Sequence, residues 1–495
     1  MNKTDQLNNR HTLPRWRSIN EHLWNTDSLP FLTPNNRLSV EEQDYSYYIA
    51  ALSEWQKEHS LFNAVELISQ SRMLGLSDDT VVSDYIRNCV LQNPQLPKII
   101  LEFIGNDCQV ETSPTNMQIA KCKKQVIDHP LNALIWVELA RNYMINGQFV
   151  KCEKALTIAN QLAPNNRYIL RCFARFFYHI GEYGKALDVL RRSAIINFDP
   201  WVIASEIAIS SSLKVKSRNV SLAKRLLQSK NIHPFSLSEL ASEIATLEGY
   251  AGNIKNSKKL FSQALEKANE NSFAQAIWAS KILVPLDFEK LCSMQIEDAY
   301  EGHVYCGIYT HDDWYQIIRH NISWHKFQPF SSRPISFGSL IYDDLLNDYR
   351  SAINLCEEGL KSNYKDFGIH NNLAYSYILN GQGAEAKQVI EQYLSSFKTD
   401  REHQFYMAMQ GMYEMRFGDI DIGKVFYLKA MNIEKQNQYA RISQNGFSSS
   451  VLLYYLRERK LIGEDIHKEA IELHKKIKDN ILLNALFSAF KLDAD

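Results

Sequence analysis

The chain has 495 residues, of which 45% are hydrophobic and 22% are charged, so its composition is that of a folded protein and not of a disordered one. Only 19 residues are glycine and 13 are proline, which disfavours a long all-β chain because such chains need many tight turns. The 55 basic and 56 acidic residues leave a formal net charge of −1, a balance that does not favour non-specific binding to nucleic acid or to an anionic membrane.

The first segment, 1–40, is polar and is predicted to be an irregular arm that contains Trp16, Trp24 and Phe31. It lacks the apolar centre of a signal peptide, and no later stretch reaches the roughly 18 apolar residues of a membrane span. The eight cysteines form no CxxC pair and no closely spaced framework, which favours reduced thiols. We therefore expect a cytoplasmic protein without a membrane segment.

A repeat with a period of 34 residues begins after 132. Its columns are large, large, small, aromatic, glycine, small, large and small in two successive units: Trp136, Leu139, Ala140, Tyr143, Gly147, Cys152, Leu156 and Ala159, then Leu170, Phe173, Ala174, Phe177, Gly181, Ala186, Leu190 and Ser193. The first four columns share one face of a helix, the glycine turns the chain, and the last three form the inner stripe of a second helix. Neither helix can bury its stripe alone, so neighbouring hairpins must stack.

This pattern resembles the tetratricopeptide repeat (TPR) family, whose unit is a helix–turn–helix of 34 residues. The resemblance implies an all-α fold, a right-handed α-solenoid of stacked hairpins with an irregular interruption in the middle of the chain. The predicted segments are an N-terminal arm over 1–40, degenerate helical hairpins over 41–132, a first TPR block over 133–285, an aromatic and histidine-rich interruption over 286–332, a second TPR block over 333–437 and a helical cap over 438–495.

The interruption contains residue types that bind zinc: His303, Cys306, His311, His320 and His325. Their spacing matches no recognised zinc knuckle, and many aromatic residues share the stretch, so a packed structural insertion is the preferred interpretation and a zinc site is an alternative. Arg319 and His325 also fit the loose R-x(4–6)-H signature of HEPN-type ribonucleases, whose Arg and His act on the scissile phosphate. That signature occurs here at close to its chance frequency.

Two glycine-rich stretches, 381–386 and 418–425, resemble nucleotide-binding loops. Each follows a predicted helix, whereas a phosphate-binding loop of this kind needs a preceding strand. We therefore predict no cofactor and assign no catalytic residue.

In the TPR family the first helices of the repeats line the concave face, so residues between their packing positions are candidate partner contacts. The resemblance implies the following contact residues: Arg141, Tyr168, Arg171, Arg175, Tyr178 and His179 in the first block, and Asn371, Asn372, Tyr375 and Met412 in the second. The three arginines suit an acidic or C-terminal peptide, because guanidinium groups bind carboxylates. The alternative interpretation is a solvated charged face on which they pair with Glu206, Glu239 and Glu243. The apolar second face suits a docked helix or an extended segment.

The sequence thus predicts a non-enzymatic adaptor or scaffold that binds one or more proteins or peptides in its groove. One alternative is an enzyme or metal protein whose chemistry lies in 286–332. Another is an RNA-binding repeat protein, against which the near-neutral charge and the lack of a basic stripe count.

Overall fold

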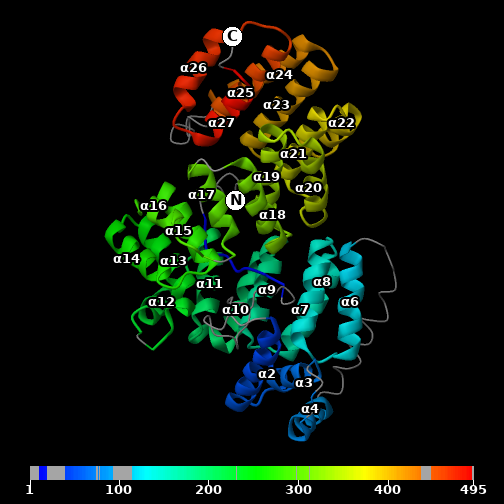
Figure 1. Cartoon of the computed structure of the whole chain (residues 1–495), viewed down its shortest axis with the longest axis vertical. Helices are drawn as coiled ribbons and strands as arrows, with labels where there is room; N and C mark the ends of the chain where they lie inside the picture. The colour runs from blue at the N-terminus through cyan, green and yellow to red at the C-terminus, as the bar shows by residue number, and fades with distance from the viewer. Residues whose placement is uncertain are drawn as a thin grey trace. The chain divides into compact units, whose positions relative to one another are not determined.

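The computed structural model describes residues 10–18, 40–73, 76, 79–92, 114–229, 231–296, 298–310, 313–435 and 447–492. These residues form helices joined by short turns, and they include no strand, which confirms the predicted all-α fold for this part of the chain. The chain divides into two compact units, of which unit 1 ends at Ala299 and unit 2 begins at Tyr300 (Figure 1).

Unit 1 consists of successive antiparallel helices. Their bounds are α2 Val40–Lys57, α3 Leu61–Met73, α4 Thr80–Gln92, α6 Pro114–Asp128, α7 Ala133–Ile145, α8 Phe149–Leu162, α9 Arg167–His179, α10 Tyr183–Arg192, α11 Pro200–Ser212, α12 Val220–Leu226, α13 Pro234–Tyr250, α14 Ile254–Leu265, α15 Glu270–Ile282 and α16 Phe288–Cys292, with a short 3-10 turn at Ala194–Asn197. The first helices of the hairpins, α7, α9, α11, α13 and α15, contact one another in that order and form an inner layer. Their partners α8, α10, α12 and α14 complete the hairpins.

The turns within these hairpins follow the predicted glycine positions. Gly147, Gly181 and Gly252 have φ values of 70°, 86° and 81°, in the left-handed region where glycine carries no steric cost. The hairpin of α11 and α12 has a longer turn, in which Lys214 takes the left-handed conformation with φ 58°. The local sequence therefore sets where each hairpin turns.

Unit 2 has the same hairpin organisation. Its elements are α17 Tyr300–Thr310, α18 Trp314–Phe327, α19 Ser332–Leu340, the π-helical turn η2 Ile341–Leu345, α20 Tyr349–Ser362, α21 Phe367–Leu379, α22 Gly383–Gln392, a 3-10 turn at Leu394–Ser396, α23 Asp400–Phe417, α24 Ile420–Lys435, α25 Phe447–Leu461, α26 His467–Ile477 and α27 Ile481–Ala489. The described part of the predicted interruption, 286–332, is largely helical. It holds α16 in unit 1, and α17 and α18 in unit 2, where Trp324 is 1% exposed and packs with hydrophobic residues of both helices.

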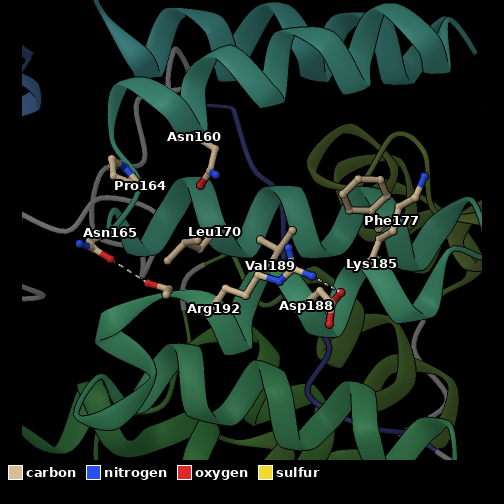
Figure 2. Close-up of a pocket in the computed structure, with 10 residues that line it drawn as sticks. Asn160, Pro164, Asn165, Leu170, Phe177, Lys185, Asp188, Val189 and Arg192 are labelled. Atoms are coloured by element: carbon tan, nitrogen blue, oxygen red, sulfur yellow. Dashed lines mark hydrogen bonds and ion pairs between the residues drawn. The ribbon is translucent and has the colours of Figure 1, made fainter. Parts of the chain in front are cut away.

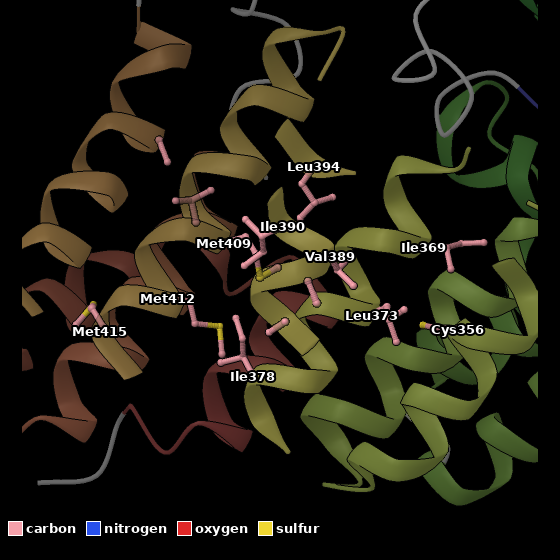
Figure 3. Packing of buried hydrophobic residues seen from close by; sticks show 14 of the residues in the cluster. Cys356, Ile369, Leu373, Ile378, Val389, Ile390, Leu394, Met409, Met412 and Met415 are labelled. Carbon is pink, nitrogen blue, oxygen red and sulfur yellow. The ribbon is translucent and has the colours of Figure 1, made fainter. Parts of the chain in front are cut away.

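The core of unit 2 runs between the hairpins from α20 to α25 and contains Met409, Met412 and Met415 (Figure 3). Helices α23 and α24 approach closely at two glycines. A Cβ atom added at Gly423 would lie 2.5 Å from Met415 Cγ and 2.8 Å from the carbonyl oxygen of Gly411. The second helical block is therefore tightly packed where the methionines lie.

Candidate functional site

The inner layer of unit 1 is covered by a segment from the start of the chain. An amphipathic helix at a surface keeps one face in water, whereas α7 is buried over 133–144 and α15 over 270–279. Besides the neighbouring helices, the segment 10–18, Arg-His-Thr-Leu-Pro-Arg-Trp-Arg-Ser, lies on this face, and we call it the arm segment. It has no helical or strand structure, and its Trp16 is 1% exposed. The inner face of unit 1 is thus a site that already holds a peptide.

The centre of this site is the carboxylate of Glu243 on α13, which is fully buried. Its Oε1 lies 2.7 Å from Nδ1 of His11, and its Oε2 accepts hydrogen bonds of 3.0 Å from both the amide nitrogen and the hydroxyl of Thr12. Burial by itself raises the pKa of Glu243, but the interactions with His11 and Thr12 outweigh burial and hold the pKa below its ordinary value. The carboxylate therefore depends on the arm segment for its charged form.

Two amide side chains on α15 bind the backbone of the arm segment. Gln275 donates to the carbonyl oxygen of Arg10 at 2.7 Å, and Asn271 donates to the carbonyl oxygen of Leu13 at 3.1 Å. The guanidinium group of Arg10 returns hydrogen bonds to both side chains, at 2.5 Å to Gln275 Oε1 and 3.2 Å to Asn271 Oδ1. The two bonds to backbone carbonyl oxygens recognise an extended main chain, and the two from Arg10 depend on its side chain.

The remaining contacts are ion pairs and hydrogen bonds that involve three helices. Oε1 of Glu270 on α15 lies 3.3 Å from Nε of Arg15 and 3.2 Å from Nη2 of Arg17. The hydroxyl of Tyr168 on α9 donates to the carbonyl oxygen of Arg17 at 2.8 Å. On α7, Glu138 accepts a hydrogen bond of 2.7 Å from the hydroxyl of Ser18. The site is thus a track of buried carboxylates and amides along α7, α9, α13 and α15, matched by a basic segment.

The three predicted groove arginines do not form an open basic patch. Arg171 is 2% exposed, and its Nη2 lies 2.7 Å from Glu239 Oε2, so it shows the pairing with a glutamate that was the alternative interpretation. Arg141 is also buried, with Nη1 3.7 Å from Glu138 Oε1. Burial lowers the pKa of Arg175 to about 10, and the neighbouring charge of Arg15 adds to this shift. The Arg141, Arg171 and Arg175 side chains therefore belong largely to the interior of unit 1.

The other predicted contact residues of the first block lie at different depths. Tyr168 is 1% exposed and binds the arm segment, as described above. Tyr178 and His179 are partly buried at the end of α9, where Tyr178 packs on Tyr183 and His179 packs on Phe149. Partner binding by these residues stays a prediction.

The sequence prediction named Glu243 only as a pairing partner of the groove arginines, and it assigned no role in binding to the acidic residues and amides of the track. They lie on helix faces that the TPR register assigns to the groove, but nothing in the sequence marks them as buried. The one available signal is the arm segment itself, which carries four basic or titratable side chains within eight residues: Arg10, His11, Arg15 and Arg17.

In unit 2 the predicted contact residues lie in or beside the core. Met412 is 2% exposed, and its sulfur lies 3.7 Å from Nη2 of Arg457. Tyr375 donates its hydroxyl hydrogen to Asp344 and packs its ring 5.4 Å from the Arg457 guanidinium group. Asp344 is itself buried and bonded to Arg457 at 3.3 Å. The apolar face expected here is closed by hairpin packing and by this ion pair, so Met412 is a core residue.

The two predicted asparagines of this block lie on α21. Asn372 donates to the carbonyl oxygen of Ser336 at 3.0 Å and to the hydroxyl of Ser339 at 2.9 Å, which ties α21 to α19. Asn371 is partly buried beside Asn372. Their predicted contact with a partner is therefore untested, and Asn372 has a structural role.

The predicted metal ligands do not converge in the described part of the chain. The rings of His303 and His320 lie 5.4 Å apart, Cys306 is buried, and burial lowers the pKa of His325. His311 lies outside the described residues. Within the described ranges no three His, Cys, Asp or Glu side chains gather closely enough to share a metal ion.

The two residues of the HEPN-like signature differ in their exposure to solvent. Arg319 on α18 is exposed, whereas His325 on the same helix is partly buried. A nuclease site requires both side chains to face one phosphate, and the two residues differ in their access to solvent.

A hollow of about 530 Å³ lies between α8, α9 and α10 (Figure 2). Polar groups on its rim bond to one another: Arg192 contacts Asp188 at 3.0 Å, and Asn165 accepts a hydrogen bond of 3.1 Å from Ser193. Its floor includes Leu170 and Phe177. The hollow lacks the buried carboxylates that characterise the inner face.

No family model and no curated protein matches the chain. Among solved structures, the human IFIT1 dimer with PPP-AAAA is 19% identical, with a TM-score of 0.36, and the match covers 78% of this chain and 96% of that chain. Yeast Tom70 is 10% identical over 92% of this chain and 97% of its own, with a TM-score of 0.31. A tetratricopeptide repeat protein from Parabacteroides merdae ATCC 43184 is 12% identical over 60% and 91%, with a TM-score of 0.24.

None of the described helices combines the length and the hydropathy that a transmembrane span requires. The described cysteines are free thiols.

Proposed function

We propose that the chain is a non-enzymatic scaffold that binds an extended segment of a partner protein on the inner face of unit 1. The observation that carries the proposal is the pair of hydrogen bonds from Gln275 and Asn271 to backbone carbonyls of the arm segment. Main-chain contacts of this kind give affinity for an extended peptide, and side-chain pockets add selectivity. A cytoplasmic location and the absence of a cofactor remain predictions.

The charge of the inner face favours a protein ligand over RNA. Glu138, Glu243 and Glu270 lie along the track that the arm segment follows, and each is buried. A phosphate backbone placed there would meet three carboxylates, whereas RNA-binding surfaces are basic. The RNA-binding alternative is therefore weaker than the protein-binding one.

A cross-linking experiment tests the proposal. The full chain carrying Arg10→Glu and Arg17→Glu, which we call the arm-released variant, would have its inner face accessible, because both substitutions place a carboxylate against the acidic track. Partners captured from the native cell extract are cross-linked to it, and the linked peptides are mapped by mass spectrometry. We expect partner peptides to map to α13 and α15.

The matched control is Arg192→Glu, a charge reversal on α10 at a side chain that is 80% exposed. This variant should capture no more than the wild type, because it leaves the arm segment in place. Cross-links that map away from the inner face in the arm-released variant would refute the proposed site.

A further inference from the structure

The inner face is built for a cation-bearing occupant. Glu243 is 0% exposed, Glu270 is 5% exposed and Glu138 is 4% exposed. Burying a carboxylate is costly unless it is paired and hydrogen-bonded. The arm segment supplies two arginines to Glu270 and, through His11 and Thr12, three polar contacts to Glu243. An uncharged occupant would leave Glu243 and Glu270 buried without the polar and ionic contacts that the arm segment supplies.

The contacts also define a spacing along the occupant. Cationic side chains meet the site at Arg10 and again at Arg15 and Arg17, with the buried Trp16 between the last two. Pro14 is buried and favours an extended chain at the preceding residue. The amides of α15 bind the backbone of the arm segment and the side chain of Arg10, so we expect the spacing of the cations and of the aromatic residue to set the selectivity.

From these contacts we infer that unit 1 binds an arginine-rich extended segment of a partner protein, and that the arm segment is an intramolecular competitor occupying the same site. This inference rests on the proposed function and names the partner class. The expected ligand has a basic residue, a spacer of about four residues with an extended backbone, and then an aromatic residue flanked by arginines, as the contacts of the arm segment imply. An acidic or C-terminal peptide, which the three groove arginines suggested, does not fit this surface.

The arm segment is a displaceable ligand. A tethered segment has an effective concentration in the millimolar range for a short linker, so it blocks weak ligands and yields to ligands that bind better.

The test uses a fluorescein-labelled peptide with the sequence of residues 10–18, added in trans to the full chain and followed by fluorescence anisotropy. We expect the arm-released variant to bind the peptide at least about tenfold more tightly than the wild type, because the wild-type site is occupied in cis. Affinity should fall as salt rises, since part of the interaction is ionic. A peptide with its three arginines replaced by glutamate should not bind.

A second substitution locates the binding. Adding Glu243→Gln and Glu270→Gln to the arm-released variant should weaken peptide binding about tenfold or more, because these substitutions remove the two buried carboxylates that contact the arm sequence. Circular dichroism and thermal melting must show that each variant is folded. Trypsin cleavage after Arg15 should accelerate in the arm-released variant relative to the wild type, which reports release of the arm independently of the peptide.

The results that overturn the inference differ from those that overturn the proposed function. If partner peptides cross-link to α13 and α15 but the basic peptide does not bind the folded arm-released variant, the partner class is wrong and the scaffold function stands. Equal binding of the glutamate peptide would refute the charge argument. If light scattering shows that the wild type is a dimer that the peptide dissociates, the arm serves a second copy, and competition within one chain is refuted.

Discussion

A substitution of Arg171 tests whether the inner face of unit 1 is a buried layer of ion pairs. The Arg171 guanidinium group is 2% exposed, donates to Ser205 at 3.1 Å and lies 2.7 Å from Glu239. It also stacks 5.0 Å from the ring of Trp201. Because Arg171→Met leaves the fully buried Glu239 without its cation, we expect unit 1 to lose about 3–5 kcal/mol of unfolding free energy.

The assay is urea unfolding followed by tryptophan fluorescence, since Trp201 packs directly on the substituted side chain. Glu239→Gln removes the buried charge, and the double variant Arg171→Met/Glu239→Gln should recover about 1–3 kcal/mol relative to the sum of the single losses. The control is Arg192→Met, whose exposed pair with Asp188 should contribute less than about 1 kcal/mol. If Arg171→Met costs no more than Arg192→Met, the guanidinium group is solvated and our account of the inner face is wrong.

Three further predictions concern packing, titration and metal binding. Gly423→Ala should destabilise unit 2 by about 1–3 kcal/mol in urea unfolding, because its Cβ would overlap the backbone of α23, whereas Gly184→Ala, with open space around the new Cβ, should be neutral or stabilising. Burial raises the pKa of Asp343 well above 3.8. The stability that this group contributes is therefore fully present below pH 3.8 and is lost as the pH rises through the folded-state pKa. The melting temperature of Asp343→Asn should lack this pH dependence. His303→Ala and His320→Ala should leave zinc content unchanged and below one equivalent by elemental analysis, and one equivalent lost in either variant would revive the metal site.

The hairpins were predictable because the information that determines them is local. Gly147 and Gly181 lie in the turns between the two helices of their hairpins, where the backbone is left-handed. The small residues Ala140 and Cys152 permit the close approach of α7 and α8. These features recur at a fixed period, so one unit supports the assignment of the next. The longer turn at Lys214 was predictable for the same reason, since the repeat spacing is broken there.

The arm segment was not predictable, because its contacts join residues that are far apart in the chain. His11 meets Glu243, 232 residues away, and Arg10 meets Gln275, 265 residues away. Helical periodicity carries no information about such pairs. The sequence showed an arm that contains Trp16 and several cations, and it showed glutamates at groove-facing positions. Nothing in it indicated that the arm and these glutamates are in contact.

The charge of the inner face shows why residue type alone misleads at a buried site. A count of arginines on groove positions predicts a basic surface, yet Arg171 is neutralised by Glu239 inside the helical layer and contributes no free charge to an occupant. The carboxylates of Glu243 and Glu270 have no such partner on neighbouring helices among their described contacts and are matched by the arm segment. The charge of the occupant is therefore set by the charged groups that do not pair within the helical layer. Glu243 and Glu270 are such groups, and because both are acidic the segment that binds them is basic.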